Sequence, residues 1–422
     1  MELSVDRALQ LAAEAHKSGR LQDAEQLYRA ILQVRPRNPD ANHGLGVLDA
    51  GAGDKAELAL SHLRIAVDSA PQRGEFWISY INALANLGRP DQARRVLEQG
   101  RQLGLAGTAV DALIKSLQVD GSKPLHLLTP DLVQYQLGVL ARRGSSFLEF
   151  PAHVHLETLA RCNAACNFCP YPALDRKGER MSDALIEKII SDLEDIPRSH
   201  RFQLSPFKVN EPFLDTRLFD LLDQFRARLP NASVSLTSNA TPITERTLDR
   251  LSGYPDLQYL WISFNDHRRD AYEKAMALPY DRTIDRLDMI HRRKAEGSFG
   301  IRVVLSRVGD GSSVDREFPD WVKTNYPLFD SHIFPRGEWL GQVASAPSAS
   351  PPNVGCARWF DLSITATGII AHCCMDGNAE HPIGDVTKSH LLEIYNHPEY
   401  RKLRESAHSR LEVDPCRRCN FL

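Results

Sequence analysis

Closely spaced cysteines are the residues of this 422-residue chain best suited to chemistry. Three of the eight stand at Cys162, Cys166 and Cys169, in the pattern C-x3-C-x2-C, and none precedes them. Clustered thiolates select an iron–sulfur cluster or zinc. A structural zinc ion needs four ligands, and no fourth Cys or His follows at a suitable spacing. Three thiolates on a four-iron cluster would leave one iron open to a small chelating ligand.

The other five cysteines lie near the end of the chain, at Cys356, Cys373, Cys374, Cys416 and Cys419. Two strand-like runs around a Thr-Gly turn in 361–371, followed by a helix from about 389 to 406, would bring four of these thiols to one point. Five thiols then compete for four positions. The residues after 353 are too few to build much core, and a metal centre would supply the missing stability. A small zinc ribbon is the alternative here, because zinc would have ample ligands.

From residue 151 onward, strand-like runs alternate with helix-like runs, and the first cysteine group follows the first strand. In a helix predicted from Met181 to Leu193, Ser182 can cap the start and apolar residues recur on one face. Six strands alternating with helices predict a parallel sheet with right-handed crossovers, whose functional loops follow the carboxyl ends of the strands. The strand-like runs are 153–159, 202–207, 233–239, 257–264, 300–307 and 330–334.

Residues 5–105 carry an internal repeat with a period near 34 residues. Small residues such as Ala12 and Ala24 recur where two helices of a hairpin would touch, and Gly19 and Gly88 mark turns. This pattern resembles the tetratricopeptide repeat, whose helical hairpins stack and offer a concave surface to peptides. An unrelated helical bundle is the alternative.

The first cysteine group and its surroundings resemble the radical S-adenosylmethionine (SAM) superfamily. The resemblance rests on the cysteine motif after the first strand, on Phe168 before the last cysteine, and on further elements in the expected order. It covers about 151–340 and implies a partial barrel of six strand–helix units. It also implies that Cys162, Cys166 and Cys169 hold a [4Fe-4S] cluster to which SAM binds.

Later elements resemble the SAM-binding elements of this superfamily. After the second strand, a Glu-Pro pair stands where the family has a GGEP-type element that holds the methionine amino group, although other residues replace its two glycines. After the third strand, a Thr-Ser-Asn run resembles a TNG-like turn, and polar residues on later strands are expected near the ribose or the methionine carboxylate. The residues expected to contact SAM are Asn210, Glu211, Pro212, Thr237, Ser238, Asn239, Ser263, Ser306 and Arg336.

The carboxyl-terminal cysteines resemble the twitch domain, the shortened form of the SPASM extension found in many radical SAM enzymes. The resemblance implies one auxiliary iron–sulfur cluster, expected to be [4Fe-4S], since too few cysteines remain for another. The expected ligands are Cys356, Cys374, Cys416 and Cys419. We prefer Cys374 to Cys373 because the family ligand follows the hairpin at about this distance, which would leave Cys373 as a buried thiol.

These patterns predict a multidomain protein with an all-α helical-repeat domain, an α/β partial (βα)6 barrel and a small α+β iron–sulfur domain. The predicted boundaries are 1–122 for the repeats, 123–150 for a linker, 151–342 for the barrel, 343–353 for a second linker and 354–422 for the auxiliary cluster domain.

The composition excludes some partners. Charge is nearly balanced, with 51 Lys+Arg against 54 Asp+Glu, which argues against nucleic acid as a partner. No apolar run approaches the roughly 18 residues of a membrane span. No signal peptide is recognisable at the start, so we expect a cytoplasmic protein that does not bind membranes.

The radical SAM resemblance implies that the protein cleaves SAM reductively to a 5′-deoxyadenosyl radical, which removes a hydrogen atom from a substrate. Electron transfer to an auxiliary cluster would make the net reaction an oxidation. The repeats favour a peptide or protein substrate, and an electron donor such as flavodoxin or ferredoxin is expected. Two alternatives remain: dehydrogenation or epimerisation of a sugar, cyclitol or other small molecule, and a non-catalytic adaptor with structural metal sites. No catalytic acid or base is assigned.

Overall fold

The computed structural model describes residues 4–50, 55–118, 130–343, 351–407 and 409–421. The chain forms two compact units, Met1–Leu148 and Glu149–Leu422. Parts of both predicted linkers, 123–129 and 344–350, lie outside the described residues. No helix within the described ranges is long and apolar enough to cross a membrane.

The first unit is helical, as the sequence predicts. From α1 to α7 each helix packs against the next, and α8 packs against α4. Residues 130–143, which were expected to be part of a linker, instead form α8, with Val139 and Leu140 buried. The helices are α1 (Val5–Lys17), α2 (Leu21–Val34), α3 (Pro39–Ala50), α4 (Ala56–Ser69), α5 (Gly74–Asn86), α6 (Pro90–Gln102), α7 (Thr108–Ser116) and α8 (Pro130–Arg143).

Small residues explain how closely these helices approach. Ala12 and Ala24 are fully buried, and a Cβ built on Gly46 would lie 2.7 Å from the Cγ atom of Leu63 in the next helix. Gly19, with a φ of +74°, adopts the left-handed conformation that a side chain would disfavour. The small residues that recur in the sequence therefore lie where helices touch, and Gly19 lies in a turn between two helices.

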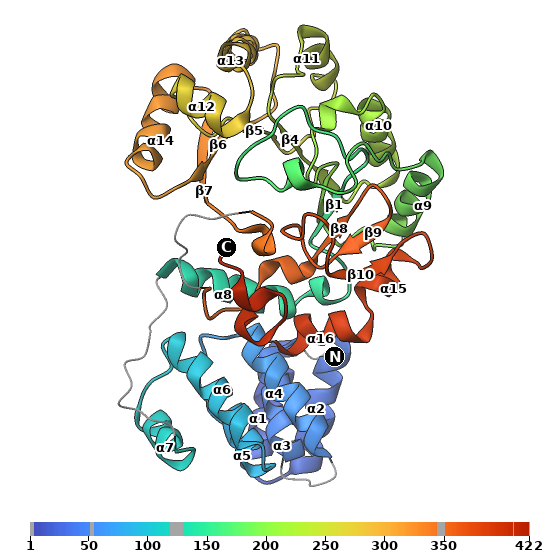
Figure 1. Ribbon diagram of the computed structural model, residues 1–422. Helices are drawn as coiled ribbons and strands as arrows, with labels where there is room; N and C mark the ends of the chain where they lie inside the picture. The colour runs from blue at the N-terminus through green and yellow to red at the C-terminus, as the bar shows by residue number, and fades with distance from the viewer. Residues whose placement is uncertain (1–3, 51–54, 119–129, 344–350, 408, 422) are drawn as a thin grey trace. The chain divides into compact units, whose positions relative to one another are not determined.

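The second unit contains parallel strands that alternate with helices, as expected (Figure 1). Neighbours in β1-β2-β3 and in β4-β5-β6-β7 are parallel and follow chain order. The strands are β1 (His153–Leu156), β2 (Phe202–Ser205), β3 (Ala232–Val234), β4 (Leu236–Ser238), β5 (Leu260–Ser263), β6 (Val303–Gly309) and β7 (Asp330–Pro335). The helices are α9 (Asp183–Glu194), α10 (Leu218–Arg228), α11 (Glu245–Leu251), α12 (Arg269–Met276), α13 (Tyr280–Ala295) and α14 (Val314–Asn325).

The third predicted strand is interrupted at Ser235, which the sequence analysis did not foresee. The backbone N–H of Ser235 donates to the carbonyl of Leu204 (3.1 Å), and the next N–H, of Leu236, donates to the carbonyl of Tyr259 (3.2 Å). The chain thus changes partner within one residue, from β2 to β5. One predicted strand therefore becomes β3 and β4, in two sheets.

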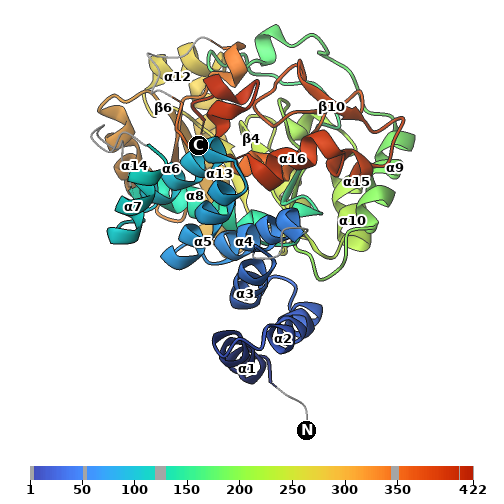
Figure 2. The ribbon, with the colours of Figure 1, turned by 90° about the horizontal axis from the view of Figure 1, so that it is seen from below.

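Helix α9 shows how the sequence covers this sheet. The Ser182 hydroxyl accepts a hydrogen bond from the N–H of Leu185 (3.2 Å), which confirms the predicted cap. Ile186, Ile189 and Ile190 face the core, and each buried aliphatic side chain contributes about 1.5–3 kcal/mol. Helices α9, α10 and α15 lie along one side of this unit (Figure 2).

The carboxyl-terminal segment extends the same sheet. Strand β8 pairs in parallel with β1, and β9 and β10 add antiparallel strands beyond it (Figure 1). The predicted single helix is two helices, because Pro398 cannot continue the hydrogen bonding of the preceding turn. The elements are β8 (Asp361–Ile364), β9 (Ile369–Ala371), β10 (Pro382–Asp385), α15 (Leu391–Tyr395) and α16 (Pro398–Ser406). Short 3-10 helices are η2 (Ser146–Leu148), η3 (Tyr171–Ala173), η4 (Pro212–Leu214), η5 (Trp339–Gly341), η6 (Ala357–Phe360), η7 (Arg410–Glu412) and η8 (Cys416–Arg418).

Candidate active site

The first three cysteines lie on the loop that follows β1, and all three line one cavity of about 300 Å³. Burial raises the pKa of Cys162 to about 12 and the pKa of Cys169 to about 11. Burial also raises the pKa of Cys166 well above its usual value. Thiols must lose their protons to bind a metal, so a strongly positive centre is needed to hold three half-buried thiolates together. The donor set therefore fits a metal cluster.

Backbone contacts hold the cysteine loop against the end of α12. The N–H of Ala165 donates to the carbonyl of Met276 (3.2 Å), and the N–H of Asn167 donates to the carbonyl of Ala275 (2.9 Å). The Cys166 Sγ atom lies 3.5 Å from the Met276 Sδ atom. The position of the cysteines therefore depends on where Met276 is held.

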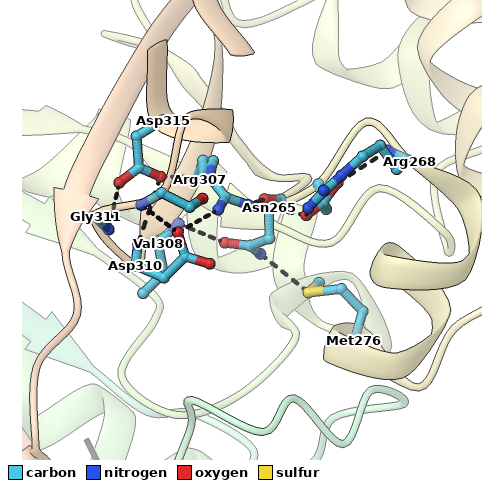
Figure 3. Close-up of polar contacts among 10 residues, drawn as sticks. Asn265, Arg268, Met276, Arg307, Val308, Asp310, Gly311 and Asp315 are labelled. Carbon is cyan, nitrogen blue, oxygen red and sulfur yellow. Dashed lines mark hydrogen bonds and ion pairs between the residues drawn. The ribbon is translucent and has the colours of Figure 1, made fainter. Parts of the chain in front are cut away.

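A polar network around Asn265 fixes Met276 (Figure 3). Asn265, with a φ of +68°, donates from Nδ2 to Met276 Sδ (3.0 Å) and accepts at Oδ1 from the N–H of Val308 (2.9 Å). The buried Arg307 guanidinium donates to the Asn265 carbonyl (2.7 Å) and to Asp315 Oδ1 (2.7 Å). This network links β5 and β6 to the cysteine loop, although no spacing pattern in the sequence marks it.

Glu211 is a buried carboxylate on the wall of the same cavity. Its two oxygens accept hydrogen bonds from the Ser238 hydroxyl (2.9 Å), the Asn239 N–H (2.7 Å) and the Phe213 N–H (3.2 Å). No basic side chain in the described part of the chain pairs with it, and burial raises its pKa to about 7. A cationic ligand group would relieve the cost of a charge buried here. The site thus fits an ammonium group.

Two asparagines offer further polar groups beside Glu211. Asn239 Nδ2 donates to Asn163 Oδ1 (2.8 Å) and lies 3.9 Å from Cys162 Sγ. Asn210 accepts at Oδ1 from the N–H of Lys208 (2.9 Å), whereas its buried Nδ2 has no partner among the described residues. An amide donor is therefore available to a ligand in this cavity.

The structure gathers most, but not all, of the residues expected to contact SAM. Pro212 begins η4 and is absent from the lining. Ser306 is buried within the sheet, where its hydroxyl donates to the carbonyl of Ile262 (3.4 Å). Arg336 instead donates to the carbonyl of Asn167 in the cysteine loop (3.1 Å). The expected contacts that line the cavity are Asn210, Glu211, Thr237, Ser238, Asn239 and Ser263.

The second cysteine group differs from the sequence expectation in one residue. A smaller pocket is lined by Cys356, Cys373, Cys416 and Cys419 together with two arginines and several apolar side chains. Cys374, the expected ligand, lines the larger cavity with the first three cysteines instead. The preference for Cys374 relied on distance along the chain, which cannot distinguish two adjacent side chains that face different cavities.

Buried cations that the sequence did not single out fasten the two cysteine regions together. Arg176 makes a bidentate ion pair with the fully buried Glu157 (2.6 and 2.9 Å) and donates to the carbonyl of Gly377 (2.7 Å). Lys208 Nζ donates to the carbonyl of Asp376 (2.6 Å). The loop after the adjacent cysteines is thereby held to the first cysteine loop.

Family comparisons agree with this arrangement. Residues 156–312 match the model of the radical SAM superfamily, and residues 356–420 match SPASM, an iron–sulfur cluster-binding domain. The chain therefore contains a radical SAM domain and a SPASM domain. Its cofactors are SAM and iron–sulfur clusters, with a cluster in each of the two domains.

The chain is similar to proteins described with different molecules, an inosamine in one case and a precursor peptide in another. The chain is 22% identical over 274 residues to the S-adenosyl-L-methionine-dependent 2-deoxy-scyllo-inosamine dehydrogenase of Niallia circulans, covering 63% of this chain and 92% of the relative. BtrN, solved in complex with AdoMet and 2-DOIA, is similar over 65% of this chain and 94% of its own, at 16% identity and a TM-score of 0.46. Streptococcus suis SuiB, solved bound to precursor peptide SuiA, is similar over 82% of this chain and 85% of its own, at 14% identity and a TM-score of 0.48.

Proposed function

We propose that this protein is a radical SAM oxidoreductase that removes a hydrogen atom from an organic substrate and completes a net oxidation. The observation that carries the proposal is that three half-buried thiols and the uncompensated carboxylate of Glu211 line one cavity. When bound, the reduced cluster and SAM supply a 5′-deoxyadenosyl radical, which can abstract hydrogen from an unactivated carbon.

The residues of this chain would bind and orient that group. Cys162, Cys166 and Cys169 would hold the [4Fe-4S] cluster. Glu211 would accept hydrogen bonds from the methionine amino group, because it is a buried carboxylate without a described cationic partner. The free Nδ2 of Asn210 would donate to an acceptor of the ligand.

Polar residues at later strand ends would complete the SAM site. Thr237, Ser238, Asn239 and Ser263 lie on the cavity wall and would contact the ribose or the methionine carboxylate. Pro212, Ser306 and Arg336 would act indirectly, by shaping the turn, the sheet and the cysteine loop that carry the contacting groups.

We assign the auxiliary [4Fe-4S] cluster to Cys356, Cys373, Cys416 and Cys419, which share one pocket. His372 Nε2 lies 3.1 Å from Cys416 Sγ and would orient this ligand. Two arginines, Arg358 and Arg410, also line this pocket, and their positive charges would stabilise the anionic cluster. The cluster would accept the electron that makes the net reaction an oxidation, and a flavodoxin or ferredoxin would reduce the first cluster.

The substrate has two candidate classes. Tetratricopeptide-type packing of the helical unit, supported by its period and buried small residues, would favour a peptide or protein. The relative from Niallia circulans favours a small hydroxylated ring, since it is named as an inosamine dehydrogenase. A partial (βα)6 barrel, supported by the parallel order of β1 to β7, would enclose either kind of reacting group.

The test is anaerobic reconstitution with iron and sulfide, followed by dithionite and SAM. We expect about eight iron and eight sulfide per chain and formation of 5′-deoxyadenosine. Cys162→Ala should lose about four iron and form no 5′-deoxyadenosine. Zinc in place of iron, or 5′-deoxyadenosine formation by Cys162→Ala at the wild-type level, would refute the proposal and favour a non-catalytic adaptor.

A further inference from the structure

The cavity has a second polar region, away from the cysteine loop. It is formed within the strands rather than after their carboxyl ends: His153 and His155 project from β1, Ser205 from β2 and Ser235 from the break between β3 and β4. Tyr259, Trp261, Phe334 and Phe207 also line the cavity. Aromatic walls with a few convergent polar groups are typical of a small-molecule site.

Most of the polar groups in this region already satisfy one another. His153 Nε2 lies 2.9 Å from the Ser205 hydroxyl, which lies 2.8 Å from the Ser235 hydroxyl. The rings of His153 and His155 lie 3.9 Å apart between centroids. His155 is the exception, since its buried Nε2 makes no hydrogen bond within the described part of the chain and its nearest charged neighbour there is Asp361.

Asp361 determines which nitrogen of His155 is available. Its Oδ2 atom lies 3.9 Å from His155 Nε2, beyond hydrogen-bond distance but close enough to attract an N–H. The Arg358 guanidinium, 3.1 Å from the same oxygen, and His155 hold the pKa of Asp361 at about 2, so this group is an anion. Because a carboxylate only accepts, the facing Nε2 carries the proton, and Nδ1 is left as an acceptor.

A neutral imidazole with a free acceptor suits a hydroxyl donor. Burial lowers the pKa of both His153 and His155, which keeps the rings uncharged at neutral pH. The ligand atoms of His153, His155 and Asp361 also lie within 4.8 Å of one another, a spacing that could hold a metal ion. A metal cation at this position would be repelled by the Arg358 guanidinium, and it would break the contact between Ser205 and His153. The charges therefore favour an uncharged ligand group.

We propose that this polar region is the substrate subsite and that His155 Nδ1 accepts a hydrogen bond from a substrate hydroxyl. The inference rests on the proposed function and narrows its substrate to an alcohol. The alcohol is either a free polyol or the side chain of a seryl peptide. Asp361 acts as a positioning residue that fixes the tautomer and orientation of His155.

Calorimetric titration of the reconstituted holoprotein tests the subsite. With SAM present and no reductant, nothing turns over, so the readout is binding alone. One arm compares 2-deoxy-scyllo-inosamine with cyclohexylamine, and the other compares acetyl-Gly-Ser-Gly-amide with acetyl-Gly-Ala-Gly-amide. We expect one alcohol to bind at least about tenfold more tightly than its hydroxyl-free counterpart. The arm that shows this difference identifies the substrate as a free polyol or as a seryl peptide. Equal affinities in both arms would overturn the proposal.

Variants assign the contact to His155. We expect His155→Phe to weaken binding of the alcohol about 10- to 100-fold, and His155→Asn, whose amide oxygen can replace Nδ1 as acceptor, to restore most of it. The matched control is His291→Phe on α13, a histidine that also has an unpartnered ring nitrogen and packs on Tyr326 and Phe329, outside the cavity lining. Equal weakening by His291→Phe would overturn the proposal.

Two further measurements separate the possible failures. Formation of 5′-deoxyadenosine with dithionite and no substrate should be the same in wild type and His291→Phe. Loss of this activity in every sample would refute the proposed function, while the titration would still decide the subsite. A metal ion beyond the cluster iron that disappears in His155→Phe would overturn the hydroxyl proposal in favour of a metal site.

Discussion

Replacing the buried carboxylate of Glu211 by an amide should change stability in a direction that depends on pH. Burial raises the pKa of Glu211 from 4.5 to about 7 in the cluster-free protein. Below pH 4.5 the group is neutral in both folded and unfolded chains. Between pH 4.5 and about 7 the unfolded chain loses the proton while the folded chain keeps it, so the stability of the wild type falls as pH rises.

The size of the effect follows from that interval. At about 1.4 kcal/mol per pH unit, the buried charge costs the wild type about 3 kcal/mol above pH 7. Glu211→Gln avoids this cost, but its NH2 group cannot accept all three hydrogen bonds, and losing one costs about 1 kcal/mol. We therefore expect the variant to be less stable by about 1 kcal/mol near pH 4.5 and more stable by about 2 kcal/mol at pH 8.

Urea unfolding followed by fluorescence measures this difference. In a Trp77→Phe background, the four remaining tryptophans all lie after residue 148 and report on the second unit alone. The control is Glu296→Gln, which replaces an exposed carboxylate after α13. If Glu211→Gln shifts stability by the same amount at pH 5 and pH 8, the reasoning about a buried charge is wrong. The same variant should bind SAM about 10- to 100-fold more weakly, since it lacks the negative charge.

Three other experiments test separate parts of the structure. Arg176→Met leaves the carboxylate of Glu157 buried without its partner, and we expect a loss of about 3–5 kcal/mol in urea unfolding; a loss below about 1 kcal/mol would contradict the ion pair. Cys373→Ser should lower reconstituted iron by about four per chain, whereas Cys374→Ser should leave it unchanged; the reverse result would restore the sequence-based choice. Gly46→Ala should overpack α3 against α4 and cost about 1–3 kcal/mol, measured as a lower Tm of the helical unit, and an unchanged Tm would show that these helices can separate freely.

Periodic and local signals in the sequence predict much of the fold. Apolar residues at helical spacing and the cap at Ser182 locate α9 to within a few residues, because both signals depend on neighbours in the chain. The hairpin of β8 and β9 follows from the Thr-Gly turn, where Gly368 has a φ of +87°. The break at Pro398 follows from the missing N–H of proline, although the expected helix of about 389 to 406 runs through this position.

Features that depend on distant partners could not be predicted. The interruption at Ser235 arises because two adjacent N–H groups donate to different strands: that of Ser235 to Leu204 in β2, and that of Leu236 to Tyr259 directly before β5. The pairing of Arg176 with Glu157 joins residues without any helical or strand-like spacing. The choice between Cys373 and Cys374 depends on which cavity each side chain lines, and spacing along the chain does not determine this.

The parallel pairing of β8 with β1 ties the auxiliary cysteines to the sheet that carries the first cysteine loop. A chain truncated before Cys356 would leave β1 with a bare edge of unsatisfied N–H and C=O groups, which invites pairing with other molecules. It would also remove Asp361 from beside His155. An exchange of the auxiliary cluster domain between related proteins would therefore have to include β8 as well as the cysteines, because β8 is an integral strand of the sheet that contains β1.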